Sequence, residues 1–168
     1  MVEMIKKFYS LISKGYNKLY YEEQIKKLKI IKKLVGNKIK PLLLDIGCGT
    51  GISTDFFGIK AVGIDPSLEM LKEFNSKNDK VCGICEHLPF KNETFKTIIS
   101  ITAIHNFKNI DKAIDEIKRV AKKDAFFIFT LLKRSKKFKT IKKILEKNFN
   151  LEEFDEGKDL ILFGKLID

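Results

Sequence analysis

Short apolar runs alternate with amphipathic stretches along most of the chain. Alternating strand and helix patterns predict right-handed crossovers and an α/β fold built on a parallel sheet. The expected strands cover Leu42–Ile46, Lys60–Ile64, Val81–Cys85, Phe95–Thr102 and Ala125–Leu132.

The stretches between these runs carry helical patterns. Residues 3–35 are expected to form two helical pieces broken near Gly15, and the second piece has an apolar face of Ile25, Leu28, Ile31 and Val35. Further helices are expected over Gly51–Phe57, over 68–75 with Ser67 as the cap, from Ala113 to Lys122 and Lys123, and up to about Lys147.

The end of the chain has a different pattern. Phe149–Phe154 and Leu160–Ile167 flank the turn residues 156–159, which predicts a β-hairpin that adds an antiparallel strand at the sheet edge. No repeat or linker interrupts the chain, so we expect a single domain over residues 1–168.

A glycine-rich turn follows the first expected strand. The sequence at 42–51 is LLLDIGCGTG, in which Asp45 ends the apolar run and glycines follow at 47, 49 and 51. The second expected strand leads into Asp65. Glycines let the backbone turn tightly beside a ligand, and an acid after the next strand can accept hydrogen bonds from ribose hydroxyls. The pattern predicts a nucleotide-type site at the carboxyl edge of the sheet.

Composition limits the kind of protein. The longest apolar stretch, Ala125–Leu132, is too short to span a bilayer, and the N-terminus lacks the continuous apolar core of a secretory signal. A soluble cytoplasmic protein is expected. The net charge of +11 comes almost entirely from lysine, with Arg only at 119 and 134. Such a surface can attract nucleic acid or acidic partners, but the same bias is found in heat-adapted proteins.

The three cysteines do not indicate a metal site. Cys82 and Cys85 form a C-x-x-C, but no second ligand pair follows, and the segment does not open a helix as a redox pair normally does. Small residues in a buried strand are the favoured interpretation.

Four blocks of sequence carry a family resemblance. They are 44–51 (LDIGCGTG), 63–67 (GIDPS) with 70–71 (ML), 86–90 (EHLPF) and 100–107 (SITAIHNF). On these blocks the chain resembles the class I S-adenosylmethionine-dependent methyltransferases, particularly the subgroup that includes the quinone C-methyltransferases. The resemblance covers about residues 40–168. It implies a Rossmann-like, doubly wound and mostly parallel seven-stranded sheet with an antiparallel C-terminal hairpin, and N-terminal helices (1–36) that cap the site.

The resemblance also implies contacts to S-adenosylmethionine as the cofactor. Asp45 would accept from the ammonium group or hold the glycine loop, and Asp65 would bind the ribose hydroxyls. The turn at 88–90 would line the adenine pocket. The whole set of expected cofactor-binding residues is Asp45, Gly47, Cys48, Gly49, Thr50, Gly51, Asp65, Pro66, Ser67, Glu86, His87, Leu88, Thr102, Tyr16 and Tyr20.

Two positions leave alternatives open. The family usually has an Asp where this chain has Ile84, so Glu86 or a backbone carbonyl reads the adenine amino group, or apolar contact holds the ring; Glu86 as a surface acid is equally favoured. His105 is the candidate catalytic base, because imidazole titrates near neutral pH. Its alternative role is a loop histidine that completes the pocket wall.

The expected acceptor is a small molecule. One rival is RNA or an acidic protein partner, gripped by the basic segment Lys133–Lys143, although a solvated helix face is the commoner meaning of such a segment. Another is a non-catalytic, cofactor-binding partner subunit, and a nicotinamide-dependent oxidoreductase is disfavoured by the Leu-Pro-Phe turn. No Asn-Pro-Pro-Tyr-type motif follows the fourth strand, which argues against exocyclic amino groups of bases and glutamine amides as acceptors.

Overall fold

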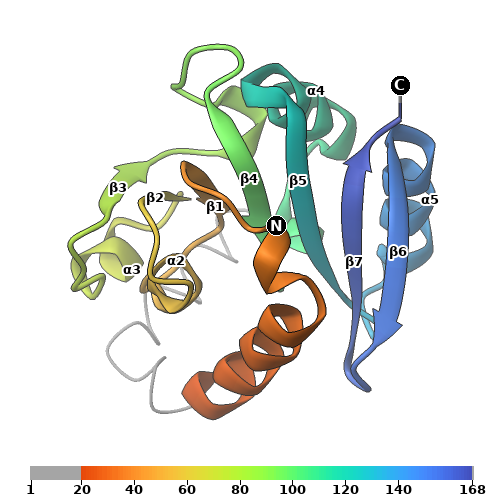
Figure 1. Ribbon diagram of the computed structural model, residues 1–168, viewed down its shortest axis with the longest axis horizontal. Helices are drawn as coiled ribbons and strands as arrows, with labels where there is room; N and C mark the ends of the chain where they lie inside the picture. Colours follow the sequence, from red (N-terminus) through yellow and green to blue (C-terminus); the bar gives the residue numbers. More distant parts are fainter. Residues whose placement is uncertain (1–19, 168) are drawn as a thin grey trace.

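The computed structural model describes residues 20–167, which form a seven-stranded sheet flanked by helices (Figure 1). The order across the sheet is β3-β2-β1-β4-β5-β7-β6. The strands are β1 (Leu43–Ile46), β2 (Ala61–Asp65), β3 (Asp79–Cys82), β4 (Phe95–Ser100), β5 (Ala121–Leu132), β6 (Phe149–Asp155) and β7 (Asp159–Leu166).

The strand directions place an opening between β1 and β4. β1 to β5 run parallel, whereas β7 is antiparallel to both β5 and β6. The chain moves outward from β1 to β2 and β3, then returns to the other side of β1 for β4 and β5. A reversal of strand order opens a crevice beyond the carboxyl ends of the two strands. The predicted doubly wound sheet and its antiparallel hairpin are confirmed.

Helical layers cover both faces of the sheet. The helix of residues 20–35 and α2 (Ile52–Phe56) pack on one face, and α4 (Ile110–Val120) and α5 (Phe138–Asn148) pack on the other. Neighbouring strand residues such as Phe127 and Ile128 point to opposite layers, as the two-residue period of a strand requires. The shorter elements are α3 (Leu68–Lys72), η1 (Gly36–Lys38), η2 (Cys85–His87) and η3 (Ile104–Asn106).

The predicted position of the third strand is wrong. β3 covers Asp79–Cys82, whereas the apolar pattern predicted Val81–Cys85. β3 lies at the sheet edge and most of its residues are exposed, so its sequence lacks the apolar run by which a buried strand is predicted. The chain leaves the sheet at Gly83, and Cys85 is buried in η2.

The boundary between α4 and β5 also differs from the prediction. The helix ends at Val120, and Lys122 and Lys123 belong to the strand. Ala121 pairs with Phe95 before the register shifts, and this irregular strand start carries no clear alternation of polar and apolar residues.

The N-terminal prediction is confirmed only for its second part. The helix of residues 20–35 buries Leu28, Ile31 and Val35 as expected, and it also buries Lys27, which was not expected. The first helical piece and Tyr16 lie outside the described residues. No helix within residues 20–167 is both long enough and apolar enough to cross a membrane.

Candidate cofactor-binding site

A pocket of about 260 Å³ lies at the carboxyl ends of β1, β2 and β4. Its volume is close to the lower end of the range for ligand sites, about 300 Å³. It lies where the strand order reverses, as the fold predicts. Its wall consists of Ile46, Gly47, Gly49, Ile64, Asp65, Pro66, Ser67, Met70, Gly83, Ile84, Cys85, Glu86, Ile101, Thr102, Ala103, Asn106, Phe107 and Lys108.

The glycine loop has left-handed backbone at all three of its glycines, with φ of 77°, 55° and 86° at Gly47, Gly49 and Gly51. A Cβ at Gly47 would stand 2.4 Å from Ala103 Cβ, and one at Gly51 would stand 2.4 Å from the Phe74 ring. Protein packing therefore already excludes side chains at these two positions. Gly47 and Gly49 line the pocket, whereas Gly51 lies behind it and caps α2.

Asp65 ends β2 and joins the two loops that form the pocket. Its Oδ2 accepts from the Gly49 N–H (3.0 Å), and its Oδ1 accepts from the Ser67 N–H (2.8 Å). A carboxylate oxygen has more than one lone pair, so Asp65 can accept a ligand hydroxyl while it keeps these bonds. Pro66 and Ser67 line the pocket beside it, and the Ser67 hydroxyl caps α3.

Asp45 lies behind the pocket wall and is fully buried. Its Oδ2 accepts from the hydroxyls of Ser53 (2.6 Å) and Thr54 (2.7 Å), so it holds α2. Burial raises the pKa of Asp45 to about 6, and the two hydroxyls oppose this rise. Of its two predicted roles, this geometry favours holding the loop.

Cys48 and Thr50 are also buried outside the pocket wall. Cys48 packs against β2, since a Cβ at Gly63 would stand 2.7 Å from Cys48 Sγ. Burial raises the pKa of the Cys48 thiol well above its usual value, which fits a structural residue.

The turn that contains Glu86 contributes unevenly to the pocket. Glu86 is buried in the wall, and its Oε1 accepts from the N–H groups of Lys108 (2.6 Å) and Asn109 (3.0 Å). It is therefore not a surface acid. Leu88 is buried outside the wall, and His87 is exposed with its Nε2 2.8 Å from Lys112 Nζ.

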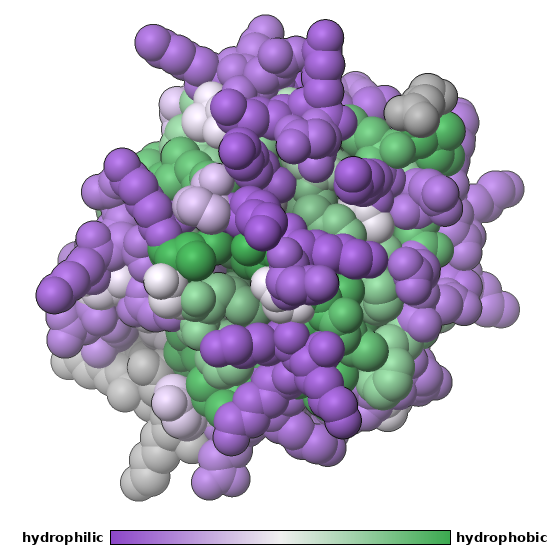
Figure 2. Space-filling model, in the orientation of Figure 1, coloured by the Kyte–Doolittle hydropathy of each residue, from purple (hydrophilic) through white to green (hydrophobic). Residues whose placement is uncertain are grey.

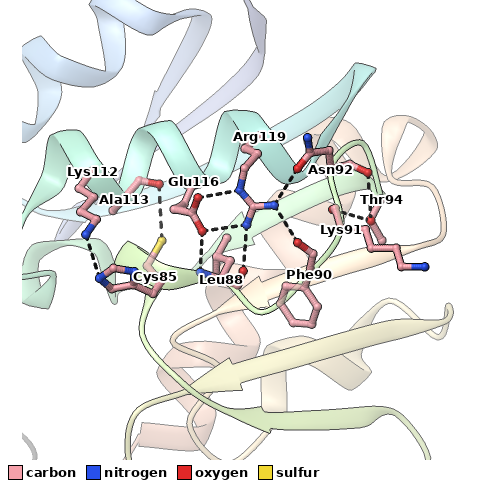
Figure 3. Close-up of polar contacts among 11 residues, drawn as sticks. Cys85, Leu88, Phe90, Lys91, Asn92, Thr94, Lys112, Ala113, Glu116 and Arg119 are labelled. Carbon is pink, nitrogen blue, oxygen red and sulfur yellow. Dashed lines mark hydrogen bonds and ion pairs between the residues drawn. The ribbon is translucent and has the colours of Figure 1, made fainter.

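Arg119 of α4 clamps this turn (Figure 3). Its guanidinium donates to the carbonyls of Leu88 (2.9 Å) and Phe90 (2.7 Å) and forms paired bonds with the Glu116 carboxylate. Glu116 in turn accepts from the Leu88 N–H (2.7 Å). Only a planar guanidinium offers so many donors at fixed angles, so an arginine in a lysine-rich chain marks this position.

Thr102 was expected to end the fourth strand, but β4 ends at Ser100, and Thr102 lines the pocket beyond it with a left-handed φ of 54°. Its hydroxyl contacts Lys27 and Asp159, which form a buried ion pair. The sequence prediction missed both residues. Lys27 lies four residues before Ile31, on the inward face of its helix, and this spacing was the available signal.

His105 lies in η3, outside the pocket wall. Burial lowers the pKa of His105, and the charge of Asp159 opposes that effect. The Nδ1 atom is buried and has no hydrogen-bond partner among the described residues. A largely neutral imidazole is the form that can accept a proton. Tyr20 also lies outside the wall and is 36% exposed.

The basic segment 133–143 is partly neutralised by its own fold. Lys133 pairs with Asp155 (2.7 Å), and Lys142 pairs with Glu153 (2.8 Å). Lys137 Nζ donates to the carbonyl of Phe107 (2.9 Å), which belongs to the pocket wall. Figure 2 shows hydrophilic residues spread around the whole visible face rather than gathered in one patch.

Comparison with known proteins finds one matching family model and several relatives. A family model described as a methyltransferase domain matches residues 44–129. The uncharacterized protein MJ1252 of Methanocaldococcus jannaschii is 38% identical over 149 residues, which cover 86% of this chain and 58% of that relative. The chain thus spans little more than half of this relative's length.

Two solved structures share the fold of this chain. An S-adenosylmethionine-dependent methyltransferase of Thermotoga maritima superimposes with a TM-score of 0.74 at 18% identity, over 90% of this chain and 93% of that one. A chain in a solved complex that contains the Haloferax volcanii Trm112 methyltransferase activator has a TM-score of 0.71 at 14% identity, over 95% of this chain and 98% of that one.

Proposed function

Because the chain belongs to the methyltransferase domain family, we propose that it transfers a methyl group from S-adenosylmethionine to a small-molecule acceptor. S-adenosylmethionine is the cofactor of the class I fold that the chain shares. The observation that carries the proposal is the pocket at the β1–β4 opening, where the glycine loop and the Asp65 carboxylate meet. The quinone C-methyltransferase subgroup and the single domain over 1–168 stay predictions.

The pocket residues fit this cofactor in three regions. The backbone of Gly47 and Gly49 borders one end, where a methionyl group can approach without a side chain in the way. Asp65 offers carboxylate oxygens to the ribose hydroxyls. Ile84 and Met70 give an apolar wall on which adenine can lie. This favours apolar contact as the substitute for the missing family Asp.

Methyl transfer from this cofactor mainly requires the protein to align the acceptor with the methyl group. S-adenosylmethionine supplies a methyl group on a positively charged sulfur, which is already an activated leaving group. Holding the acceptor in line and close contributes much of the rate in such displacements. His105 lies in η3 beyond β4, next to Asn106 of the pocket wall, and we propose it as the base that takes a proton from an oxygen or nitrogen acceptor.

Calorimetry with S-adenosylhomocysteine and with NAD tests cofactor choice on the full chain. We expect one molecule of S-adenosylhomocysteine to bind per chain and NAD to bind weakly or not at all. Tighter binding of NAD would contradict the proposal and favour the oxidoreductase rival.

Methyl-labelled S-adenosylmethionine identifies the class of acceptor independently of the test of cofactor binding. The protein is incubated with a cell extract fractionated into small metabolites, RNA and proteins. We expect the label in the small-molecule fraction. Label that disappears after ribonuclease treatment would instead establish RNA as the acceptor.

The non-catalytic partner subunit is the second candidate to test, because a chain of similar fold occurs in a complex with the Haloferax volcanii Trm112 methyltransferase activator. Co-purification of the chain from its own cells tests it. A stable complex that transfers no methyl group, although it binds the cofactor, would favour this alternative over catalysis.

A further inference from the structure

A buried ion pair lies behind the wall of the pocket. Lys27 Nζ contacts Asp159 Oδ2, and the two side chains are 0% and 1% exposed. Lys27 comes from the helix of residues 20–35, and Asp159 begins β7. Burying two charges is costly, and apolar pairs of similar volume often stabilise a fold at least as well. Stability alone is therefore a poor reason for this pair.

Both charges converge on Thr102. Lys27 Nζ donates to the Thr102 hydroxyl (2.6 Å), and this hydroxyl donates to Asp159 Oδ2 (3.0 Å). The Thr102 N–H donates to Thr130 Oγ1 (2.6 Å). Hydrogen bonds thus hold both the backbone and the side chain of Thr102.

Thr102 needs such support because of its backbone. Its φ of 54° lies in the left-handed region, which a β-branched residue rarely adopts. A strained conformation of this kind persists only where surrounding contacts enforce it, and it tends to occur at functional sites.

The conformation of Thr102 sets the position of the pocket wall. Residues 101–103 all line the pocket. Ala103 packs directly on the glycine loop, since a Cβ at Gly47 would stand 2.4 Å from Ala103 Cβ. A backbone change at Thr102 would therefore alter the contact between Ala103 and Gly47.

We propose that Lys27 and Asp159 are positioning residues of the cofactor pocket, which hold Thr102 in its left-handed conformation and so fix residues 101–103 against the glycine loop. The proposal rests on the proposed function, because it assigns these residues to the cofactor site. Docking of the helix of residues 20–35 then becomes a condition for forming the pocket wall.

The double variant Lys27→Met/Asp159→Leu removes both charges without leaving one of them unpaired. Val35→Ala is the matched control, because Val35 is buried on the same helix. In the ligand-free protein, we expect the amide NMR resonances of Gly47 and Ala103 to shift in the double variant and to stay in place in the control. Affinity for S-adenosylhomocysteine should fall about tenfold or more in the double variant alone, which is about 1.4 kcal/mol or more.

A second pair of variants tests the role of Thr102 directly. Thr102→Ser keeps the hydroxyl and should bind S-adenosylhomocysteine within about twofold of the original chain, whereas Thr102→Val keeps the shape but loses the bonds and should bind about tenfold more weakly. A merely structural role would lower thermal stability in Thr102→Val without separating the two affinities.

A folded double variant with unchanged Gly47 and Ala103 resonances would overturn the proposal. Equal affinities of Thr102→Ser and Thr102→Val would do the same, and this comparison decides the matter if the double variant does not fold. If the original chain does not bind S-adenosylhomocysteine, the proposed function fails, while the ligand-free resonances still test the positioning role.

Discussion

Two aspartates in neighbouring strands, Asp45 of β1 and Asp65 of β2, have different environments. Asp65 is half-buried at the pocket and accepts backbone N–H groups, whereas Asp45 is fully buried and accepts two hydroxyls. The first can reach a ligand and the second cannot. Each of these roles can be tested by a single substitution.

Asp65→Ala is expected to weaken binding of S-adenosylhomocysteine by about 1–3 kcal/mol, because a charged hydrogen-bond acceptor is lost. Calorimetry measures the affinity. Asp79→Ala, an exposed acid on the edge strand β3, serves as the control and should bind as before. Unchanged affinity of Asp65→Ala would show that the ribose does not lie beside Asp65.

Asp45 predicts a pH dependence of stability. Burial raises its pKa from 3.8 to about 6, so the folded protein keeps a proton that the unfolded chain has released. This contribution is complete below the unfolded pKa and is lost as pH rises through the folded one. Relative to Asp45→Asn, the free energy of unfolding should fall by about 3 kcal/mol across this window, since one pKa step is worth about 1.4 kcal/mol.

Denaturant titrations of both proteins at several pH values measure this difference. A constant difference between pH 4 and pH 7 would show that Asp45 is ionised over the whole range. Asp79→Asn is the control, because Asp79 is exposed on the edge strand β3.

His105→Ala separates chemistry from binding. His105 lies outside the pocket wall, so the affinity for S-adenosylhomocysteine should change by less than about twofold. If His105 is the base, methyl transfer to the labelled acceptor should fall about 100-fold or more. His87→Ala, an exposed histidine, should change neither quantity. Full transfer by His105→Ala would remove His105 from the reaction.

At the scale of elements, α4 holds the turn at residues 85–90 through Arg119. Arg119 donates to two carbonyls of the turn and to the Glu116 carboxylate. The same carboxylate accepts from the Leu88 N–H of the turn. The same turn places Glu86 in the pocket wall, so a change in how α4 holds the turn would also change the pocket.

Arg119→Lys is expected to lower the free energy of unfolding by about 1–2 kcal/mol, because a lysine keeps the charge but cannot reproduce the fork of donors. Affinity for S-adenosylhomocysteine should fall with it. Arg134→Lys, at the other arginine of the chain, is exposed and should change neither value. Equal melting temperatures of the two variants would contradict the clamp.

The elements were predictable from sequence where burial follows a simple period. β1, β2 and the long apolar part of β5 have continuous apolar runs, so their positions agree with prediction within a few residues. The edge strand β3 is mostly exposed and has no such pattern. The position of Lys27 on the inward face of its helix does not identify Asp159 as its partner, because that contact joins distant parts of the chain.

At the scale of the whole molecule, net charge is a poor guide to the acceptor. The chain carries +11, yet lysines of the basic segment pair with Asp155 and Glu153 or support the carbonyl of Phe107. A surface whose cations already have partners releases few counterions on binding nucleic acid. The exposed lysines Lys136, Lys139 and Lys143 are the ones left to test.

The triple variant Lys136→Gln/Lys139→Gln/Lys143→Gln removes three exposed charges from this segment. With a small-molecule acceptor, labelling of the metabolite fraction and affinity for S-adenosylhomocysteine should both stay unchanged, because these side chains lie outside the pocket wall. With an RNA acceptor, binding to RNA would weaken. The slope of log affinity against log salt concentration would also become shallower by about one for each lost phosphate contact. Retention on RNA at several salt concentrations, measured for the original chain and the triple variant, therefore decides whether the lysine-rich surface binds an RNA acceptor or is only solvated.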